Sequence, residues 1–372
     1  MPVRDIPVPG HPRVLLDGTP LLGQRSGVGR YTAALLAELA TRSDLDVSVT
    51  AFTARGQGAL RAALPDGVRA RGGPVPARAL RAAWRRLSWP PVELLAGRAE
   101  VVHATNFVLP PSRRARGVVT IHDLAFLDRP GELAPQQRDL PGLVRSSVAR
   151  AAVVCTPSGA VAAQVADRLG VPADRIVVTP LGVGREWLTA GPPTGALCAR
   201  LRLPARYLLF VGAAQPRKGL DVLCDAHAAA DLPPLVLAGP AGWGQPLLAS
   251  SRIHPIGFLD DADLRSVVAG AAVLVLPSRV EGFGLPVLEA MASGVPVVCS
   301  DVPALREVSG GLATLVAPGD PVALAAALDS AVHDGAETDP AAATARRAHA
   351  ARHTWQACAA ATVRAYSLAL GQ

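Results

Sequence analysis

Two glutamates flank a glycine-rich turn late in the sequence, and together they could bind a ligand. Glu281 precedes the turn Gly282–Gly284, and Glu289 lies about one and a half turns into the helix expected to follow. Glycines let backbone N–H groups approach an anionic or hydroxylated ligand, and the start of a helix adds positive potential. Carboxylates beside such a turn accept hydrogen bonds from paired hydroxyls. The alternative is an ordinary strand–turn–helix with two solvated glutamates.

The sole lysine of the chain, Lys218, adjoins Arg217 between an expected strand and an expected helix, Tyr207–Val211 and Leu220–Ala229. Two adjacent cations near a helix N-terminus can hold a diphosphate, with the lysine as a point charge and the arginine as a planar fork. A solvated basic turn is the alternative. All other basic residues are arginines, and their abundance beside many alanines indicates biased coding more than function.

Three residues of the first half follow expected strands. His122 follows Val118–Ile121, so it should lie at the carboxyl edge of a sheet, where ligands of parallel sheets bind. A lone histidine at this edge is as often structural as functional. Gly27 and Gly29 follow the first strand, where their backbone could approach a phosphate. A flexible turn without ligand contacts is the alternative for these two glycines.

Strand-like and helix-like segments alternate along the chain, which predicts parallel sheets built of βαβ units. The strands expected in the first half are Arg13–Asp17, Val47–Phe52, Val101–His103, Val118–Ile121, Val153–Thr156 and Ile176–Thr179. Those expected in the second half are Tyr207–Val211, Leu235–Ala238, Ile253–Ile256, Val273–Leu276, Val297–Ser300 and Thr314–Val316. The expected helices include 30–40, 159–169, 220–229, 262–269, 287–292 and 322–332.

A helix-breaking stretch, Gly191–Gly195, divides the pattern into two halves. We therefore predict an α/β protein of two Rossmann-like domains, 1–190 and 191–353, which face each other across a ligand-binding cleft. The halves also differ in charge. Residues 1–185 hold 24 arginines against 14 acidic residues, whereas 186–372 hold 13 basic against 16 acidic residues. This asymmetry suggests a different partner for each domain.

The composition excludes several classes of protein. The 372 residues are 50% hydrophobic and 18% charged, which is enough to fold around two cores. No apolar run reaches about 18 residues, so no membrane-spanning helix is expected, and residues 1–11 lack the apolar stretch of a signal peptide. The five scattered cysteines have no C-x-x-C spacing, which argues against a zinc site or a disulfide framework and suits a reducing cytoplasm. Asp260, Asp261 and Asp263 are expected to cap a helix rather than to bind a metal.

Several segments, in the same order along the chain, resemble glycosyltransferase family 4, the retaining GT-B enzymes that use sugar nucleotides. Glu281 and Glu289 match its Glu-x7-Glu motif. The other matching segments are Arg25–Thr32, Thr120–Leu124, Thr156–Ser158, Val211–Leu220 and Gly257–Leu264. The resemblance covers about residues 13–335. Gln215 and Gly219 depart from the pattern, where Glu and Asn are common, and this leaves the donor open.

The resemblance implies a role for each matched residue. Arg217 and Lys218 would hold the diphosphate of the donor and stabilise the leaving group. Glu281 would contact the hydroxyls of the transferred sugar, and Glu289 would accept hydrogen bonds from the ribose. The donor-binding positions implied besides Arg217 and Lys218 are Gly27, Gly29, Gly257, Phe258, Leu259, Phe283, Gly284, Leu285 and Glu289.

Two further residues acquire catalytic roles from the resemblance. His122 would reach the transferred sugar near its 6-hydroxyl, and Asp123 would orient that histidine or touch the acceptor. Family members usually need no metal, since arginine and lysine replace the cation, and no other cofactor is implied. A C-terminal helix, within residues 354–372, is expected to cross back to the first domain, as in the family.

The resemblance thus implies a retaining enzyme that moves a hexose from a nucleoside diphosphate sugar to a glycan, lipid-linked or small-molecule acceptor. The segments around His122 and Lys218 resemble the bacterial mannosyltransferase branch, which favours GDP-mannose, followed by UDP-glucose or UDP-N-acetylglucosamine. A same-face substitution fits better than a covalent intermediate on Glu281. A catalytically silent lipid- or sugar-binding protein of this fold is the alternative from another class. An NAD-dependent oxidoreductase is disfavoured because the full glycine fingerprint is missing.

An arginine-rich segment suggests a surface partner. Residues 61–116 hold 11 arginines and three acidic residues. Within Arg78–Trp89, the side chains of Leu80, Trp84 and Leu87 recur at helical spacing, which suits a helix lying in an anionic membrane surface with the tryptophan at headgroup level. The alternative is a packed helix with a solvated arginine face. No nucleic-acid-binding motif is present. We therefore expect a cytoplasmic enzyme, at most peripheral at the inner membrane face.

Overall fold

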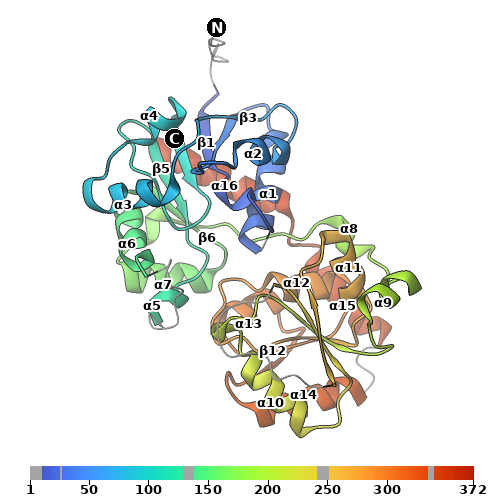
Figure 1. Cartoon of the computed structure of the whole chain (residues 1–372). Helices are drawn as coiled ribbons and strands as arrows, with labels where there is room; N and C mark the ends of the chain where they lie inside the picture. The colour runs from blue at the N-terminus through green and yellow to red at the C-terminus, as the bar shows by residue number, and fades with distance from the viewer. Residues whose placement is uncertain (1–10, 26, 129–137, 241–250, 334–338) are drawn as a thin grey trace. The chain divides into compact units, whose positions relative to one another are not determined.

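The computed structural model describes residues 11–25, 27–128, 138–240, 251–333 and 339–372 (Figure 1). The chain divides into two compact units. Unit 1 comprises residues 1–124, 137–180 and 355–372, and unit 2 comprises residues 125–136 and 181–354. The chain passes from unit 1 to unit 2 after Pro180, ahead of the glycine- and proline-rich stretch Gly191–Gly195.

Unit 1 contains a parallel sheet with the strand order β3-β2-β1-β4-β5-β6-β7. Its strands are β1 Arg13–Asp17, β2 Asp46–Thr50, β3 Arg69–Ala70, β4 Val101–Ala104, β5 Arg116–Thr120, β6 Val153–Thr156 and β7 Ile176–Val178. Its helices are α1 Gly27–Ala40, α2 Gln57–Ala63, α3 Ala77–Leu87, α4 Val92–Ala96, α6 Leu140–Arg150, α7 Gly159–Leu169 and α16 Trp355–Leu370. The six strands expected in this half are confirmed, and β3 is an additional edge strand.

Unit 2 contains a second parallel sheet with the order β10-β9-β8-β11-β12-β13. Its strands are β8 Leu208–Val211, β9 Leu235–Ala238, β10 Ile253–Gly257, β11 Val273–Leu276, β12 Val297–Ser300 and β13 Thr314–Val316. Its helices are α5 Ala125–Asp128, α8 Arg185–Leu188, α9 Gly195–Leu201, α10 Leu220–Ala229, α11 Asp261–Ala269, α12 Leu285–Ala292, α13 Pro303–Ser309, α14 Pro321–His333 and α15 Pro340–Ala350. All six strands expected in this half are present.

Both sheets have the strand order of a Rossmann fold. The direction of winding reverses between β1 and β4 in unit 1 and between β8 and β11 in unit 2. Helices cover both faces of a sheet of this kind, and so the central strands are buried along their whole length. Strands β8 and β11 are entirely apolar, whereas β4 and β6 each include one buried polar residue, His103 and Thr156. Ligands bind at the carboxyl ends of the strands beside such a reversal. Each unit therefore has one edge at which functional residues are expected.

Side-chain caps start two helices where the sequence predicts them. The Ser158 hydroxyl accepts a hydrogen bond of 3.2 Å from the Val161 N–H at the start of α7. The Asp260 carboxylate accepts one of 2.9 Å from the Asp263 N–H at the start of α11. Capping is thereby confirmed for Asp260, while Asp261 and Asp263 lie in the first turn of α11.

Helix α3 packs its apolar face against unit 1. Trp84 is 4% exposed, its ring lies edge-on to Phe52 at 4.9 Å, and its indole N–H donates to the Pro90 carbonyl at 3.0 Å. Leu80 is buried as well. The expectation that Leu80 and Trp84 face a lipid surface is therefore wrong, because their side of the helix fills the core. Leu87 and Trp89, which are 72% and 54% exposed, are the apolar side chains left outside.

None of the helices in the described ranges is long and apolar enough to span a lipid bilayer.

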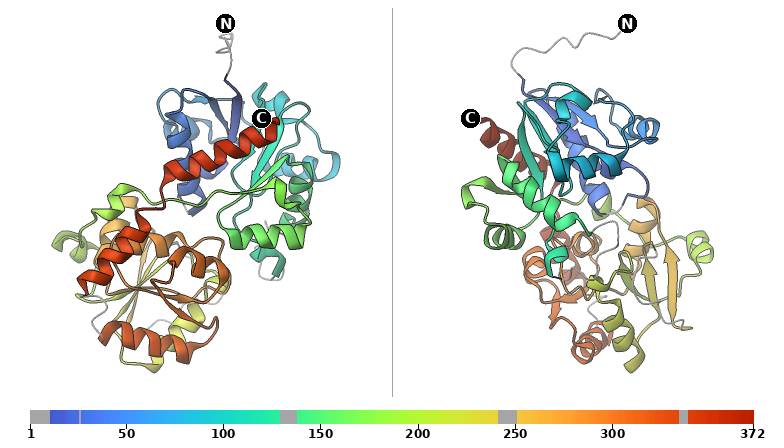
Figure 2. Two further views of the ribbon diagram at one scale, coloured as in Figure 1. Left: turned by 180° about the vertical axis from the view of Figure 1, so that it is seen from behind. Right: turned by 60° about the vertical axis from the view of Figure 1, so that its left-hand side comes forward.

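The C-terminal helix α16 belongs to unit 1 and packs against α1 and strands β4 to β7 (Figure 2). A buried chain of polar side chains joins these elements. The Tyr366 hydroxyl lies 2.8 Å from His103 Nδ1, and His103 Nε2 lies 2.8 Å from the Thr120 hydroxyl. That hydroxyl lies 3.0 Å from the Tyr31 hydroxyl. The chain of hydrogen bonds satisfies four polar groups that burial would otherwise make costly.

Acid should weaken unit 1 through His103. Burial lowers the pKa of His103 to about 3, whereas a histidine in an unfolded chain titrates near 6.5. The unfolded state takes up the proton first as the pH falls, so this contribution to stability is complete above pH 6.5 and is lost progressively below it. The loss should be about 2 kcal/mol between about pH 7 and pH 5.

Denaturant titrations of the wild type and of His103→Gln at both pH values measure this loss. The variant is less stable at neutral pH, but its stability should depend on pH less steeply than that of the wild type. Parallel curves for the two proteins would show that His103 already binds a proton in the folded state.

Candidate active site

An ion pair lies at the carboxyl ends of β8 and β11, where the strand order of unit 2 reverses. Lys218 Nζ is 2.5 Å from Glu281 Oε1, and the Ser278 hydroxyl donates to the same oxygen at 2.7 Å. Arg217 Nη1 lies 3.8 Å from Glu281 Oε2. The structure thus brings together three residues predicted from the sequence, and it adds Ser278, which the sequence analysis missed.

Glu281 is ionised despite its burial. Its side chain is only 8% exposed, and burial raises the pKa of its carboxyl. The positive charges of Lys218 and Arg217, with hydrogen bonds from Lys218 and Ser278, outweigh that effect and hold the pKa below its usual value. Oε1 takes both short hydrogen bonds, whereas Oε2 accepts none from any described residue. Oε2 can therefore accept a hydrogen bond from a ligand hydroxyl.

The backbone conformation around Lys218 permits the contact between Lys218 and Glu281. Arg217 and Lys218 lie in a short 3-10 helix, Pro216–Lys218, rather than in the first turn of α10. Gly219 follows it with φ +67°, and a Cβ atom there would lie 2.1 Å from the Pro277 carbonyl oxygen. Glycine is the residue that suits both the left-handed backbone and the close approach. The departure from the family pattern at Gly219 therefore has a structural reason.

Arg279 ties the two segments of the site together. Its guanidinium binds both carboxylate oxygens of Asp221, at 2.8 and 2.5 Å, and also the Pro216 carbonyl at 2.8 Å. Its backbone N–H donates to the Arg217 carbonyl at 2.8 Å. Gln215 Oε1 accepts from Arg217 Nε at 3.1 Å and orients that side chain. The sequence analysis did not identify Arg279 or Asp221, because nothing in their spacing shows that they pair.

The start of α12 offers backbone donors near Glu281. Gly284 takes φ +95° immediately before the helix begins at Leu285. Within the described part of the chain, no acceptor is found for the backbone N–H groups of Phe283, Gly284 or Leu285. Glu289, in the second turn of α12, is 3% exposed. Both glutamates are therefore buried, and the alternative of two solvated glutamates is wrong.

The remaining donor-binding candidates of unit 2 lie further along the same edge. Gly257 ends β10, which β9 separates from β8, and its carbonyl accepts from the Gly239 N–H at 2.8 Å. Phe258 is exposed and Leu259 is buried. These residues share the carboxyl edge of the sheet with the ion pair but do not contact it.

His122 follows the last residue of β5 by two positions in unit 1 and is almost completely buried. Its Nε2 is 2.8 Å from the Thr105 carbonyl, and the rings of Tyr31 and Phe107 lie edge-on to it at 5.0 and 5.8 Å. Burial lowers the pKa of His122, although Thr105 and the charge of Asp123 act in the opposite direction. A carbonyl can only accept, so the neutral ring carries its proton on Nε2. Nδ1 then offers a lone pair to a ligand hydroxyl, and no described residue occupies it.

Gly27 and Gly29 lie in the first turn of α1, and their surroundings differ. A Cβ atom on Gly29 would lie 2.8 Å from the Pro20 carbonyl oxygen, so this glycine permits α1 to pack closely on the short 3-10 helix Thr19–Leu21. Gly27 is exposed, and a Cβ atom there would meet nothing within 4 Å. Ser26, in the same motif, lies outside the described residues. Gly27 is the better candidate for ligand contact.

In the part of the chain that the structure describes, no three side chains of His, Cys, Asp or Glu cluster closely enough to hold a metal ion.

Comparison with known proteins identifies relatives of both halves. Residues 26–182 match the family description "Glycosyl transferase 4-like domain", and residues 205–334 match "Glycosyl transferases group 1". The chain is 32% identical over 286 residues to O-antigen chain mannosyltransferase B of Escherichia coli, which covers 72% of this chain and 74% of the relative. It is also 32% identical over 278 residues to MMP alpha-(1->4)-mannosyltransferase of Mycolicibacterium hassiacum, covering 68% and 66% respectively.

The fold has solved counterparts. The structure of Anabaena HepE in complex with UDP-glucose superimposes with a TM-score of 0.69 at 18% identity, covering 96% of this chain and all of that one. The two Rossmann-like units correspond to the GT-B fold. Because the sequence match to the Escherichia coli relative extends over most of both chains, this protein belongs to glycosyltransferase family 4 and is a glycosyltransferase.

Proposed function

We propose that this glycosyltransferase transfers mannose from GDP-mannose to a glycan, lipid-linked or small-molecule acceptor, with retention of anomeric configuration. The observation that carries the proposal is the buried Lys218–Glu281 ion pair with Arg217 beside it. The two cations suit the diphosphate of a donor, and the adjacent carboxylate oxygen suits a hydroxyl of the transferred sugar. The names of two mannosyltransferases among the relatives support mannose as the sugar.

In this proposal, Lys218 and Arg217 stabilise the negative charge that develops on the diphosphate as its bond to the anomeric carbon breaks. The backbone N–H groups at the start of α12 add positive potential toward the same anion. Glu281 orients the sugar through Oε2, while Lys218 and Ser278 occupy Oε1. Glu289 accepts from the ribose, and the backbone of 257–259 lines the base pocket.

The substitution proceeds on one face of the sugar. The bond between the anomeric carbon and the phosphate oxygen breaks, the acceptor oxygen bonds to the same face, and its proton passes to the leaving phosphate. Glu281 is a poor nucleophile because Lys218 holds its carboxylate at 2.5 Å. His122 accepts a hydrogen bond from a sugar hydroxyl through Nδ1, and Asp123 orients it or meets the acceptor. The reaction then needs no metal ion, because Arg217 and Lys218 stabilise the charge of the leaving diphosphate.

A thermal-shift panel tests the donor. GDP and GDP-mannose should raise the melting temperature without magnesium, while UDP, UDP-glucose and UDP-N-acetylglucosamine should not. A ligand at a hundredfold excess over its dissociation constant adds about 2.7 kcal/mol to the stability of the native state. Lys218→Ala should abolish the shift and serves as the control. A rise in melting temperature with uridine nucleotides alone would show that the donor is a UDP-sugar and not GDP-mannose. If none of the nucleotides shifts the melting temperature of the folded protein, a catalytically silent binding protein is favoured.

We further propose that the enzyme works in the cytoplasm and touches the anionic inner face of the membrane through the end of α3. Leu87 and Trp89 are exposed there, next to the exposed arginines Arg85 and Arg86. Exposed tryptophan and leucine beside arginines suit the headgroup region of an anionic bilayer. Contact at this surface would bring the enzyme to an acceptor carried by a lipid.

A further inference from the structure

Asp17 is a nearly buried carboxylate of unit 1 that has no role in the reaction proposed above. It is the last residue of β1, beside the point where the strand order reverses between β1 and β4. Ligands of such sheets bind at the carboxyl ends of the strands beside this reversal. Burial raises the pKa of Asp17, although hydrogen bonds from Thr19 and the charge of Arg81 act in the opposite direction. A carboxylate so poorly solvated gains from a further hydrogen-bond donor.

The two carboxylate oxygens of Asp17 differ in their surroundings. Oδ1 accepts from the Thr19 backbone N–H at 2.9 Å and from the Thr19 hydroxyl at 2.5 Å, which fixes the orientation of the carboxylate. Oδ2 accepts no hydrogen bond from any described residue. The side chain keeps some exposure, since the residue is 9% exposed, and Oδ2 is not one of the unpartnered atoms of the described chain that are sealed from solvent. A ligand can therefore reach this oxygen.

Thr105 connects Asp17 to His122 across the carboxyl ends of three neighbouring strands. Its hydroxyl donates to the Asp17 backbone carbonyl at 2.7 Å, and its own carbonyl accepts from His122 Nε2 at 2.8 Å. Strand β4 lies between β1 and β5, so the outer two strands are about 10 Å apart. Two hydrogen-bond acceptors, Asp17 Oδ2 and His122 Nδ1, thus lie on the same edge of one sheet, where the hydroxyls of adjoining sugars could reach both.

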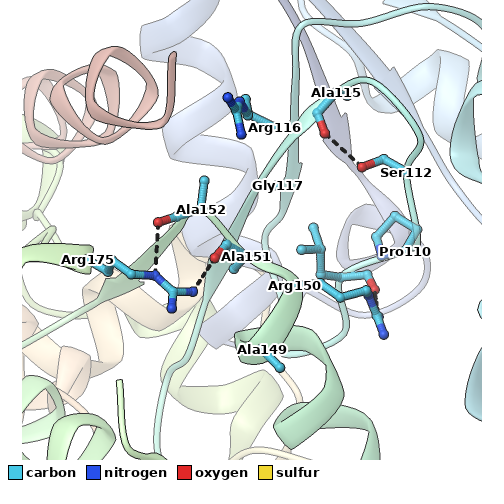
Figure 3. A pocket seen from close by; sticks show the side chains of 11 residues that line it. Pro110, Ser112, Ala115, Arg116, Gly117, Ala149, Arg150, Ala151, Ala152 and Arg175 are labelled. Atoms are coloured by element: carbon cyan, nitrogen blue, oxygen red, sulfur yellow. Dashed lines mark hydrogen bonds between the residues drawn. The ribbon is translucent and has the colours of Figure 1, made fainter. Parts of the chain in front are cut away.

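The opposite edge of this sheet offers no comparable group. A cavity of about 490 Å³ lies there and is lined in part by Arg150 and Arg175, whose guanidinium groups do not converge (Figure 3). Arg175 donates to the backbone carbonyls of Ala151 and Ala152, and Arg150 donates to that of Leu109 at 2.6 Å. Arg150 Nε has no partner among the described residues, but it is sealed from solvent. These arginines therefore stabilise the packing of α6, and the accessible unpartnered group is at the carboxyl edge.

We propose that Asp17 is an acceptor-binding residue, whose Oδ2 accepts a hydrogen bond from a hydroxyl of the acceptor's sugar. The inference rests on the proposed function and adds to it a contact for the acceptor in unit 1. An ionised carboxylate only accepts hydrogen bonds, so it selects a hydroxyl over a carbonyl or a phosphate. Because Thr19 already holds Oδ1, binding does not have to order the side chain. Asp17 takes no proton in the reaction, which still passes to the leaving phosphate.

The substitution Asp17→Asn tests this contact. It keeps an oxygen for the two donors of Thr19 and replaces Oδ2 with an amide nitrogen, which only donates. Asparagine forms such local hydrogen bonds as well as aspartate does, so the fold should be retained. The KM for methyl α-mannoside as acceptor should rise about tenfold or more, the effect of losing one hydrogen bond to a charged group. The KM of the donor and its hydrolysis without acceptor should not change.

Asp46→Asn is the matched control. Asp46 begins β2 at the opposite edge of the same sheet and pairs with Arg69. The substitution should leave the KM of methyl α-mannoside, the KM of the donor and the rate of donor hydrolysis unchanged. An unchanged KM for the mannoside in Asp17→Asn would overturn the proposal. So would an equal loss of transfer and of donor hydrolysis, because Asp17 would then act on the transferred sugar or on the fold.

Saturation-transfer NMR with methyl α-mannoside provides a test that needs no donor. The wild type and Asp46→Asn should give a signal from the bound mannoside, and Asp17→Asn should lose it. A wild type that binds no nucleotide would refute the proposed function, yet its mannoside signal would still report on Asp17. No signal from the wild type, or equal signals from the wild type and Asp17→Asn, would refute the acceptor contact alone.

Discussion

Replacing Lys218 with alanine should reduce kcat/KM for sugar transfer by about 10² to 10³-fold, the effect of removing one preorganised group that stabilises developing negative charge. The reason is that Lys218 is the ammonium at the proposed diphosphate site and the only lysine of the chain. Steady-state kinetics with the donor identified by the thermal-shift panel measure the loss. Arg306→Ala removes an exposed cation of unit 2 that pairs with Asp301, and it should leave kcat/KM unchanged.

The Lys218 variant should also lose stability, by roughly 3 kcal/mol, because it strands a buried carboxylate. The lowered pKa of Glu281 means that its ion pair stabilises the wild type above the ordinary carboxyl pKa of 4.5 and ceases to do so as the pH falls through the folded value. Without Lys218 that acid dependence should shrink.

The double variant Lys218→Ala/Glu281→Gln separates the two effects of the Lys218 substitution. It removes the stranded charge, so it should recover stability while remaining inactive. Near wild-type activity in Lys218→Ala or in the double variant would show that the assignment of the site is wrong.

Replacing Trp84 with alanine should destabilise the protein by about 3 to 5 kcal/mol, since it empties a core position that contacts Phe52 and donates to Pro90. Trp89→Ala is the matched control, because this tryptophan is five residues away and half exposed. Its effect on stability should stay within about 0.5 kcal/mol. Chemical denaturation, at a single pH, measures both.

In vesicle binding, the substitution of Trp89 should have the larger effect and the substitution of Trp84 the smaller one. Trp89→Ala should weaken binding to vesicles that contain phosphatidylglycerol, because it removes the indole that would insert among the headgroups. Trp84→Phe, which should be more stable than Trp84→Ala, should bind vesicles as the wild type does. Vesicle binding that fails with Trp84→Phe and persists with Trp89→Ala would refute the proposed membrane contact.

The sheets were predictable because buried parallel strands are continuous apolar runs between turn residues. Six expected strands, among them Arg13–Asp17 and Val273–Leu276, have the same bounds in the structure. The strand β3 was missed because its two residues, Arg69 and Ala70, carry no such signal at the edge of the sheet. The burial of Trp84 could not be deduced either. Helical periodicity identifies an apolar face but not the surface that covers it.

The candidate site was predictable where one motif carries it and not where distant segments meet. Glu281, Arg217 and Lys218 stood out through their spacing and the rarity of lysine. The bonds of Arg279 to Asp221 and Pro216 depend on the approach of two loops that are far apart in sequence.

The position of α16 bears on how the protein is synthesised. Unit 1 starts near the N-terminus, yet the helix that packs on its strands β4 to β7 and completes its buried polar chain lies at residues 355–370. Unit 2 draws its sheet from the continuous stretch 181–354. The ribosome therefore synthesises the whole of unit 2 before Tyr366 can contact His103. Although its strands emerge first, unit 1 should reach its native core last, and until then it should depend on chaperones to keep its uncovered apolar surface from aggregating.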